Sequence, residues 1–420
     1  MPRKKEAGQA LLIAAAALGI ILMGFAGLGV DMGYLRYQKR LQQTAADSAA
    51  IAGAAELLYG GAGVAAAAEH DSAANGFTNG GTGCPGGVGC VTVTVNNPPA
   101  SGPHSGAAGY VEVLVAQVQP TFFMRILGVN SETITARAVA TDTANSSGCL
   151  YTLGTTASNT YGISVIGGAT ITANNCGVID DAGLQVNNGG KITAASIGVA
   201  VPGTPPCSPP SCTPLPTTGI VPASDPLSYL TPPTPASPCI TDPTIGNGVP
   251  TTTLSPGTYC SMTICGNNGG GSTVNFNSGV YIINGNFTVG NGCTLNGTSV
   301  MFYEVTGTIS LGPMYGSANL NLTAPTTSNA STGASAGILV WQAASDTNPV
   351  TINNGSNATL TGALYFPTAA LTLAGGSNTT PYTIVVAKSI ASSNGASLTL
   401  NSNYSSLPGG SPIKDALLVE

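Results

Sequence analysis

The strongest hydrophobic pattern in the chain is an uncharged run over residues 10–30. At about 1.5 Å per residue, a helix of this length spans roughly 31 Å, close to the ~30 Å hydrocarbon core of a bilayer. The apolar part of a cleavable signal peptide usually covers only about 7–15 residues. We therefore predict a retained transmembrane helix within residues 1–33. The alternatives are a signal peptide cleaved near residues 24–26 and a buried soluble helix.

The helical pattern continues over residues 34–59. Residues 34–51 contain no Pro or Gly, and their Ala, Leu, Gln, Arg and Lys are good helix formers. A narrow stripe rich in small side chains recurs at steps of three and four residues: Tyr34, Tyr37, Leu41, Ala45, Ser48, Ala52 and Ala55. Such a stripe suits close helix packing, but periodicity does not say whether it faces the protein's own next domain or a partner helix.

A small α+β module is expected over residues 77–143. Alternation of apolar and polar residues and β-branched content give strand character to three segments: 91–95, 110–118 and 133–140. Between the last two, residues 121–128 predict a short helix that ends at Gly128.

After this module the sequence pattern changes to short segments rich in β-branched residues, separated by Gly and Asn at expected corners. Residues 163–172 realign on residues 184–193, at an offset of 21 residues. The same offset extends the alignment through three further pairs: Cys176 over Ile197, Gly177 over Gly198 and Val178 over Val199. Repeats of this length predict stacked turns of a β-solenoid that share one core. Its first part covers residues 147–200.

Residues 201–256 are dense in Pro, Thr and Ser. Because Pro lacks the N–H that a sheet interior needs, this segment predicts a linker or a strap over the surface. The pattern of short strands and Gly/Asn corners returns over residues 257–420, which are predicted to form the second part of the solenoid. The predicted fold is thus an N-terminal transmembrane helix continuing into an amphipathic helix, a small α+β module, and a mainly-β right-handed β-helix, or solenoid.

Composition narrows the class of protein. Only 7% of the residues are charged, against ~25% in ordinary globular proteins. Apolar content is still 43%, which is enough to bury a core rather than leave a disordered polar chain. The net charge of −6 argues against nucleic-acid binding, whose usual footprint is a basic stripe.

The ten cysteines all follow the apolar run, and they favour disulfides over a zinc site. No pair has C-x-x-C spacing, and the chain has two histidines. Cys84 and Cys90 are expected to close the loop between them, and Cys207, Cys212 and Cys239 to pin the Pro-rich segment. Because disulfides form in oxidising compartments, we place the N-terminus in the cytoplasm and the body outside it.

Candidate catalytic chemistry is limited to Asp180 and Asp181, with Lys191 as their companion. Adjacent strand residues point to opposite faces, and an Asp pair at a solenoid corner is typical of turn chemistry. We therefore assign no catalytic, cofactor-binding or metal-binding residue and expect no enzyme activity.

Several stretches resemble the TadE/TadG-like family of Flp pilus-assembly proteins: Gly8-Gln9-Ala10-Leu11, Gly29-Val30-Asp31-Met32-Gly33, residues 41–54, and residues 122–128 with 135–140. The resemblance covers roughly the first third of the chain. The remainder looks like the Gly/Asn-rich β-helical extensions of some members. Pilin-like members carry a Glu shortly after a Gly cleavage point, and residues 9–13 contain none. The resemblance therefore favours the TadG-like form with a retained anchor.

The resemblance implies a membrane-anchored, non-enzymatic component of a Tad/Flp-type pilus-assembly and secretion system. It implies a single-pass protein of the bacterial inner membrane with a periplasmic or extracellular body. The implied partners are inner-membrane lipid and other Tad membrane proteins or pilins, without nucleic acid or a small-molecule substrate.

Two alternative functions remain open. An exposed aromatic row on one solenoid face would favour an anchored β-solenoid adhesin or glycan-binding protein. Converging carboxylates in a cleft would favour a membrane-tethered carbohydrate-active β-helix enzyme.

Overall fold

The chain forms two compact units, each described here by itself. The computed structural model describes residues 6–57, 61–80, 84, 86–145, 148–154, 161–220, 222–243, 245, 251–265, 271–312, 318–353, 358–374, 381–408 and 410–420. The first unit consists of Met1–Ala144 and Lys414–Glu420, and the second of Asn145–Ile413. The second unit is therefore an insertion within the sequence of the first.

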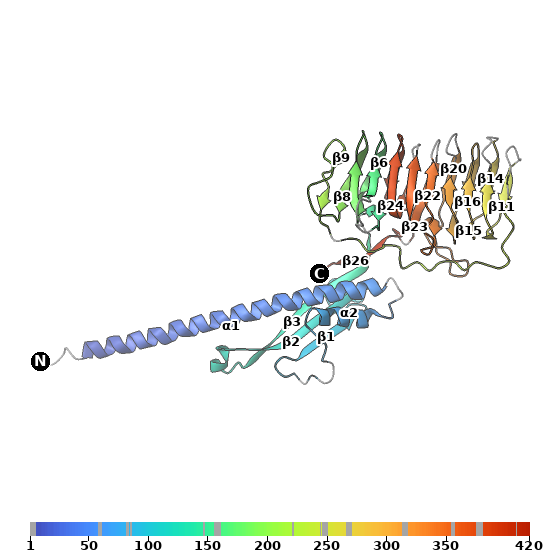
Figure 1. Cartoon of the computed structure of the whole chain (residues 1–420). Helices are drawn as coiled ribbons and strands as arrows, with labels where there is room; N and C mark the ends of the chain where they lie inside the picture. The colour runs from blue at the N-terminus through green and yellow to red at the C-terminus, as the bar shows by residue number, and fades with distance from the viewer. Residues whose placement is uncertain are drawn as a thin grey trace. The chain divides into compact units, whose positions relative to one another are not determined.

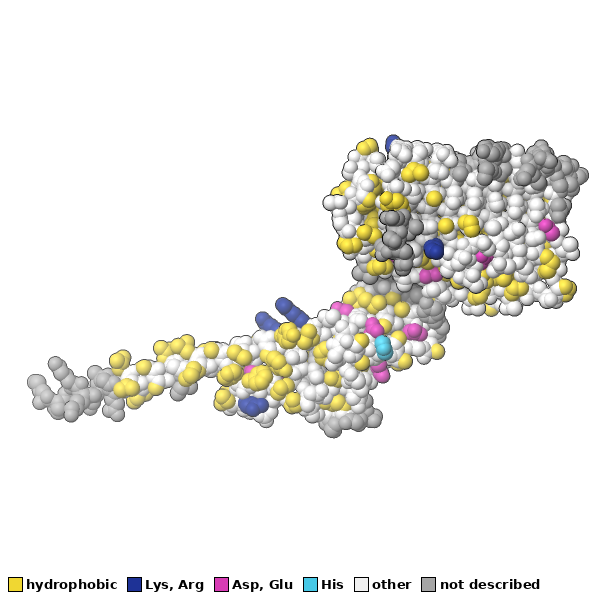
Figure 2. Space-filling view, in the orientation of Figure 1, with side chains coloured by type: hydrophobic (Ala, Val, Ile, Leu, Met, Phe, Trp, Pro, Cys, Tyr) yellow, Lys and Arg dark blue, Asp and Glu magenta, His cyan; other side chains and the backbone are white. Residues whose placement is uncertain are grey.

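The first unit begins with one continuous helix, α1 (Glu6–Leu57), of 52 residues (Figure 1). The predicted membrane segment and the amphipathic helix after it are thus parts of a single rod. Large apolar side chains are exposed along its first half, where Figure 2 shows them in yellow: Leu11, Leu12, Ile13, Leu18, Ile21, Leu22, Met23 and Phe25. A helix that is apolar all round is suited to the interior of a membrane.

A second helix, α2 (Val64–Ala74), packs against α1, and the sequence pattern does not predict it. Its buried residues are Val64, Ala68 and Ser72. Only Val64 among these is a large apolar residue, so the sequence of this helix has no clear apolar face from which it could be predicted. The Ser48 hydroxyl of α1 donates a 2.8 Å hydrogen bond to Asp71 of α2 and helps to join the two helices.

A small sheet completes the first unit, and in the described part of the chain it has four strands in the order β1-β2-β3-β26. Their bounds are β1 (Val91–Asn96), β2 (Tyr110–Pro120), β3 (Ser131–Asn145) and β26 (Lys414–Leu418). β1, β2 and β3 run antiparallel. Val139 and Glu420 exchange backbone N–H···O bonds of 2.9 and 3.2 Å, which is the pattern of an antiparallel pair.

Strand β26 therefore differs from the assignment of residues 257–420 to the solenoid. Ala416 and Leu418 pack against the core of the first unit, which gives this strand its place. The register places the end of β3 beside the start of β26, so the solenoid is inserted between two neighbouring strands of the small sheet.

The core between α1 and this sheet is built from small side chains. Ala45, Ala46 and Ala49 are fully buried, and a Cβ at Gly53 would lie only 3.1 Å from Val111. The predicted stripe is partly wrong, because Tyr37 and Leu41 are 59% and 39% exposed. The buried face of α1 contacts the protein's own sheet and α2.

The second unit is a parallel β-solenoid of about nine turns in its described residues, which confirms the predicted fold class. Strands of the first part are β4 (Gly148–Thr152), β5 (Tyr161–Val165), β6 (Thr170–Asp180), β7 (Gly183–Val186), β8 (Lys191–Val199), β9 (Cys212–Thr213) and β10 (Thr217–Thr218). Strands of the returning part are β11 (Thr252–Leu254), β12 (Gly257–Tyr259), β13 (Met262–Ile264), β14 (Thr273–Phe276), β15 (Gly279–Ile283), β16 (Phe287–Val289), β17 (Thr294–Gly297), β18 (Val300–Glu304), β19 (Ile309–Leu311), β20 (Asn319–Thr323), β21 (Ile338–Gln342), β22 (Val350–Asn353), β23 (Ala358–Ala374), β24 (Thr383–Ser393) and β25 (Ser397–Asn401).

The two parts form one stack, and the chain enters it in the middle. From β4 the chain runs to the end at β8–β10, crosses the stack as the Pro-rich segment, and returns from β11 to β25; Figure 1 shows β9 and β11 at opposite ends. β24 then stacks on β4 and β5, with Val385 beside Leu150, and β25 stacks on β6.

The predicted register is correct over most of its length and wrong at its end. Ile163 pairs with Leu184, and Ile171 pairs with Ile192, at the predicted offset. The register then shifts between Ala173 and Gly177, so Val178 lies beside Ile197 and not beside Val199. A local irregularity of this kind inserts residues that a fixed sequence offset cannot detect.

All ten cysteines are paired, as five disulfides: Cys84–Cys90, Cys149–Cys176, Cys207–Cys212, Cys239–Cys260 and Cys265–Cys293. The first closes the predicted loop. Cys239 links the Pro-rich segment to the residue after β12, so this segment is attached to the solenoid as expected.

Candidate functional site at the hairpin tip

The candidate site lies at the loop between β2 and β3, residues 121–130, which we call the hairpin tip. It contains one turn of 3-10 helix, η2 (Met124–Leu127), which ends at Gly128 with a left-handed φ of +86°. The short helix with a Gly stop is therefore observed where the sequence predicts it. Figure 1 shows the β2–β3 hairpin extending along α1.

Asp31 of α1 fastens this tip to the helix. The side chain is fully buried, and its carboxylate accepts backbone N–H bonds from Phe122, Phe123 and Met124 at 2.9, 2.9 and 2.6 Å. The first N–H groups of a helical turn have no partner within the turn, and an anion is the natural acceptor for them. Asp31 therefore acts as a cap supplied from a distant helix.

Gly27, one turn earlier on the same face of α1, seats the aromatic ring of Phe123. Gly27 is buried, and a Cβ built there would lie 2.6 Å from Phe123 Cγ. No larger residue fits unless Phe123 moves. The absence of a side chain at Gly27 thus lets the hairpin tip lie directly on the helix backbone.

Tyr34 extends the same face away from the apolar run. Its ring meets Phe122 edge-on at 5.2 Å between centroids, and its hydroxyl donates a 3.0 Å hydrogen bond to Gln119. Gly27, Asp31 and Tyr34 are spaced by four and three residues, so they share one helix face. The sequence pattern indicates Asp31 only as the end of the apolar run. The one sequence signal for this junction is an isolated acidic residue, Asp31, placed four residues after Gly27.

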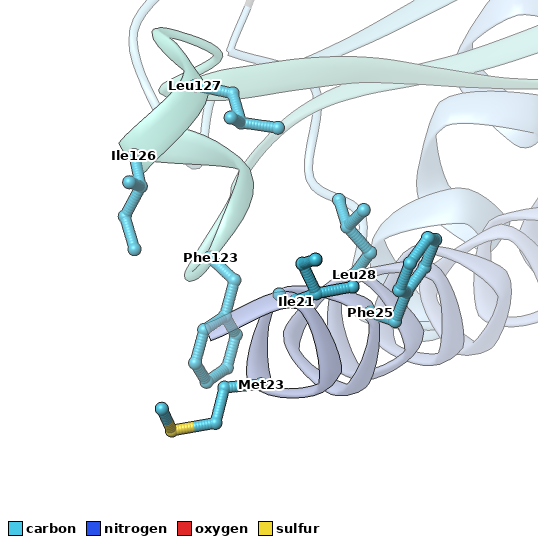
Figure 3. A pocket seen from close by; sticks show the side chains of 8 residues that line it. Ile21, Met23, Phe25, Leu28, Phe123, Ile126 and Leu127 are labelled. Carbon is cyan, nitrogen blue, oxygen red and sulfur yellow. The ribbon is translucent and has the colours of Figure 1, made fainter. Parts of the chain in front are cut away.

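The hairpin tip and α1 together line an open apolar pocket of about 560 Å³ (Figure 3). Its described lining consists of Ile21, Met23, Gly24, Phe25 and Leu28 of α1 with Phe123, Ile126 and Leu127 of the tip. In Figure 3, Phe123 lies against the helix, while Ile126 and Leu127 project from the tip. This lining carries no side chain for acid–base or metal chemistry and suits an acyl chain or apolar side chains.

The candidate acids in the solenoid are occupied in local bonding. Asp180 is fully buried and accepts hydrogen bonds from the Thr152 hydroxyl at 2.8 Å and the Ala182 N–H at 3.0 Å. Burial, only partly offset by these bonds, raises the pKa of Asp180 to about 6. Asp181 accepts the N–H of Ala223 in the Pro-rich segment.

The third member of the predicted cluster, Lys191, does not meet the two acids. Within the register of β6 and β8, Lys191 lies beside Thr170, whereas Asp180 lies beside Val199 at the other end of these strands. In the structure Asp180 therefore stabilises a turn, Asp181 contacts the Pro-rich segment, and Lys191 lies away from both.

A carboxylate pair that the sequence pattern does not reveal lies near β18 and β21. Glu304 is 1% exposed, and Asp346 is 6% exposed. Burial, reinforced by the negative charge of Asp346, raises the pKa of Glu304 to about 8. Asp346 accepts N–H bonds from Gly307 and Asn348, which hold its loop. Both acids belong to the packed body, and no group of three or more potential metal ligands occurs among the described residues.

An aromatic row does exist on one solenoid face. Tyr303 meets Trp341 at 5.0 Å, and Trp341 meets Tyr365 at 5.7 Å. All three are at most 6% exposed, because Leu227 of the Pro-rich segment packs in the same cluster. The Tyr365 hydroxyl also donates a 2.6 Å hydrogen bond to Asp225. The Pro-rich segment is thus a strap that covers the row.

Two family models match the chain, and both concern the first unit. The model described as putative Flp pilus-assembly TadE/G-like matches residues 8–56, and the one described as putative Tad-like Flp pilus-assembly matches residues 47–140. No curated protein and no solved structure matches the chain. The matched segments contain Gly27, Asp31 and the whole hairpin tip. The resemblance to the TadE/TadG-like Flp pilus-assembly family is therefore confirmed for the N-terminal third of the chain, residues 8–140.

Proposed function

We propose that the protein is a membrane-anchored, non-enzymatic component of a Tad/Flp-type pilus-assembly and secretion system. The observation that carries this proposal is the match of residues 8–140 to two pilus-assembly family models. The same residues build nearly all of α1, strands β1 and β2, most of β3, and the junction between Asp31 and the hairpin tip. The matched region is thus a helix with a domain packed against it.

The apolar half of α1 is the proposed anchor in the bacterial inner membrane. It is long and apolar enough to cross a bilayer, and its large side chains are exposed. The five disulfides support an oxidising compartment for everything after the helix. The proposed topology is therefore a single pass with a cytoplasmic N-terminus and a body in the periplasm or outside the cell.

The solenoid is the proposed contact surface for pilins or other Tad membrane proteins. Its candidate acids serve turns and the strap, which supports a structural role over a catalytic one. Its aromatic row lies beneath the strap, which gives a glycan no open stacking platform there.

The test of this role is complementation in the producing bacterium. Deletion of the gene should abolish Flp-type pili in electron micrographs, and the parent protein should restore them. Asp180→Asn, which keeps an acceptor oxygen for Thr152 and Ala182, should restore them equally well. Normal piliation of the deletion strain would contradict the assembly role, and failure of a folded Asp180→Asn protein would favour the enzyme alternative.

The proposed anchor has a separate test in the mature protein. We expect the chain to fractionate with the inner membrane and to retain its N-terminus, since the apolar run is longer than a signal peptide. N-terminal sequencing of the membrane fraction decides the point. A mature protein starting near Gly27 would show that the anchor is removed, whereas one starting at Gln9 would keep the apolar run and show that the N-terminus is processed.

A further inference from the structure

The hairpin tip exposes apolar side chains that contribute nothing to the core of the first unit. No residue of η2 is buried. Ile126 and Leu127 are 81% and 72% exposed, and Phe122 and Phe123 are 48% and 45% exposed. Four large apolar side chains are therefore exposed within six residues, and exposed apolar patches mark contact with a membrane or a protein partner.

The position of this patch along α1 favours lipid. Phe123 packs on Gly27, about 4.5 Å before the end of the apolar run at Val30. Ile126 and Leu127 share the open pocket with Phe25 and Ile21, which lie roughly 8–14 Å inside the same end of the run. If α1 crosses a membrane with this run, the tip reaches the depth of the upper acyl chains.

Several backbone N–H groups of the tip have partners within the protein. The N–H groups of Phe122, Phe123 and Met124 are satisfied by Asp31. Further along the tip, three N–H groups bond to carbonyls within it: Ile126 to Phe123, Gly128 to Arg125 and Val129 to Met124. In hydrocarbon each unsatisfied backbone group costs several kcal/mol, so the pairing of these donors lowers the cost of placing the tip at the edge of the lipid layer.

Exposed basic residues occur on the tip and on α1 beyond the apolar run, at the level where a lipid headgroup layer would be. Arg125 is exposed on the tip itself, and Arg36 and Arg40 are exposed on α1 beyond the apolar run. Long basic side chains can keep their stems on apolar surface and extend their charges to phosphate groups. Charge and apolarity therefore change along α1 in the same order as from headgroups to acyl chains.

We propose that the hairpin tip is a second membrane contact, in which Phe123, Ile126 and Leu127 insert beside α1 into the leaflet on the side of the small sheet. Asp31 is a positioning residue in this arrangement, because it satisfies the donors that would otherwise need water. The inference rests on the proposed anchoring by α1. Two insertion points fix the rotation of the first unit about the helix axis, which a single helix cannot do.

The test uses the full chain reconstituted in vesicles of phosphatidylethanolamine and phosphatidylglycerol. Ile126→Trp reports on the tip, and Ala66→Trp, on the exposed face of α2, is the matched control. Both retain Trp341, whose emission is subtracted with the parent protein. For Ile126→Trp we expect emission at shorter wavelength and at least about twofold stronger quenching by phospholipids brominated on their acyl chains, because the ring lies at the headgroup–acyl boundary.

Flotation of the vesicles separates this inference from the anchoring on which it rests. Protein that floats, with Ile126→Trp quenched no more than Ala66→Trp, would overturn tip insertion and leave the anchor intact. Protein that fails to float would overturn both. A photoreactive phenylalanine analogue at position 126 that links to another protein in native membranes, rather than to lipid, would assign the patch to a protein partner and overturn the lipid contact.

Discussion

Asp31 shows how one residue can couple a helix to a domain formed some ninety positions later in the chain. A carboxylate at the end of an apolar run would ordinarily face the aqueous interface. Here it is buried and accepts three backbone N–H groups of the hairpin tip. The contact holds the tip against α1 because three charge-assisted bonds converge on a carboxylate that is itself buried.

We predict that Asp31→Ala loosens the hairpin tip and leaves the small sheet folded. A buried donor that loses its acceptor costs about 1–3 kcal/mol, and 1.4 kcal/mol corresponds to about tenfold in an opening equilibrium. Amide hydrogen exchange at Phe122, Phe123 and Met124 should therefore accelerate at least about tenfold. The control is Asp47→Ala, which removes the carboxylate that accepts a hydrogen bond from Gln43 on the same helix. Unchanged protection at the tip would contradict the capping role.

The buried carboxyl group of Glu304 is expected to make the stability of the solenoid depend on pH. Its pKa is raised from 4.5 to about 8, first by burial and then by Asp346, so the folded state binds this proton more tightly than the unfolded state. Its contribution to stability is full below pH 4.5 and is lost as the pH rises to 8. The loss is at most about 1.4 kcal/mol per pH unit.

We predict that the melting temperature of the solenoid in the full chain falls between pH 6.5 and 8 and that Glu304→Gln flattens this dependence. The window lies above the pKa of Asp180, which is about 6, and the comparison with Glu304→Gln isolates the part of the slope that Glu304 contributes. The measurement is calorimetry across this range. Parent and Glu304→Gln proteins with the same slope would show that Glu304 is already ionised in the folded state.

At the scale of elements, the sequence predicts the helices and strands whose apolar residues recur with a clear period, and it misses those that lack one. The apolar run, the Val/Thr alternation of β1 and the turn before Gly128 each have a periodic or capping signal. α2 has little such signal, since its buried face is mostly Ala and Ser. The junction at Asp31 joins elements far apart in sequence, and no local pattern reports which distant donors a carboxylate meets.

The solenoid register has a direct test at Ile171. This side chain is 1% exposed and stacks on Ile192, so Ile171→Asp buries a charge without a partner and should cost several kcal/mol. Asn188→Asp is the control, because Asn188 lies in a corner with φ of +51°, a conformation that Asn and Asp both tolerate. Thermal melting of the full chain should show a large loss for Ile171→Asp alone. Variants that melt together would contradict the stacking.

At the scale of the whole molecule, the first unit is closed by a strand that follows the solenoid in sequence. Arg137 of β3 donates a 2.6 Å bond to the buried Glu112 of β2 and also pairs with Glu420, which follows β26. Hydrogen bonds from Ser101, Arg137 and Asn96 outweigh the effect of burial and lower the pKa of Glu112 to about 2. Arg137 thus joins β2, β3 and the residue after β26, which are the parts of the first unit before and after the inserted solenoid.

Because β3 and β26 are antiparallel neighbours, the solenoid should be separable from the first unit. We predict that replacing residues 146–413 with a two-residue Asn-Gly turn leaves a protein that folds in detergent, with helical circular dichroism and a cooperative melt. Deleting residues 414–420 from the full chain should instead lower the melting temperature of the first unit by several degrees, since 1 kcal/mol corresponds to about 4–8 °C in a small domain. The deletion removes β26 and the Glu420 partner of Arg137. An excised protein that does not fold, beside a full chain that tolerates the deletion, would show that the solenoid supports the first unit and that β26 does not.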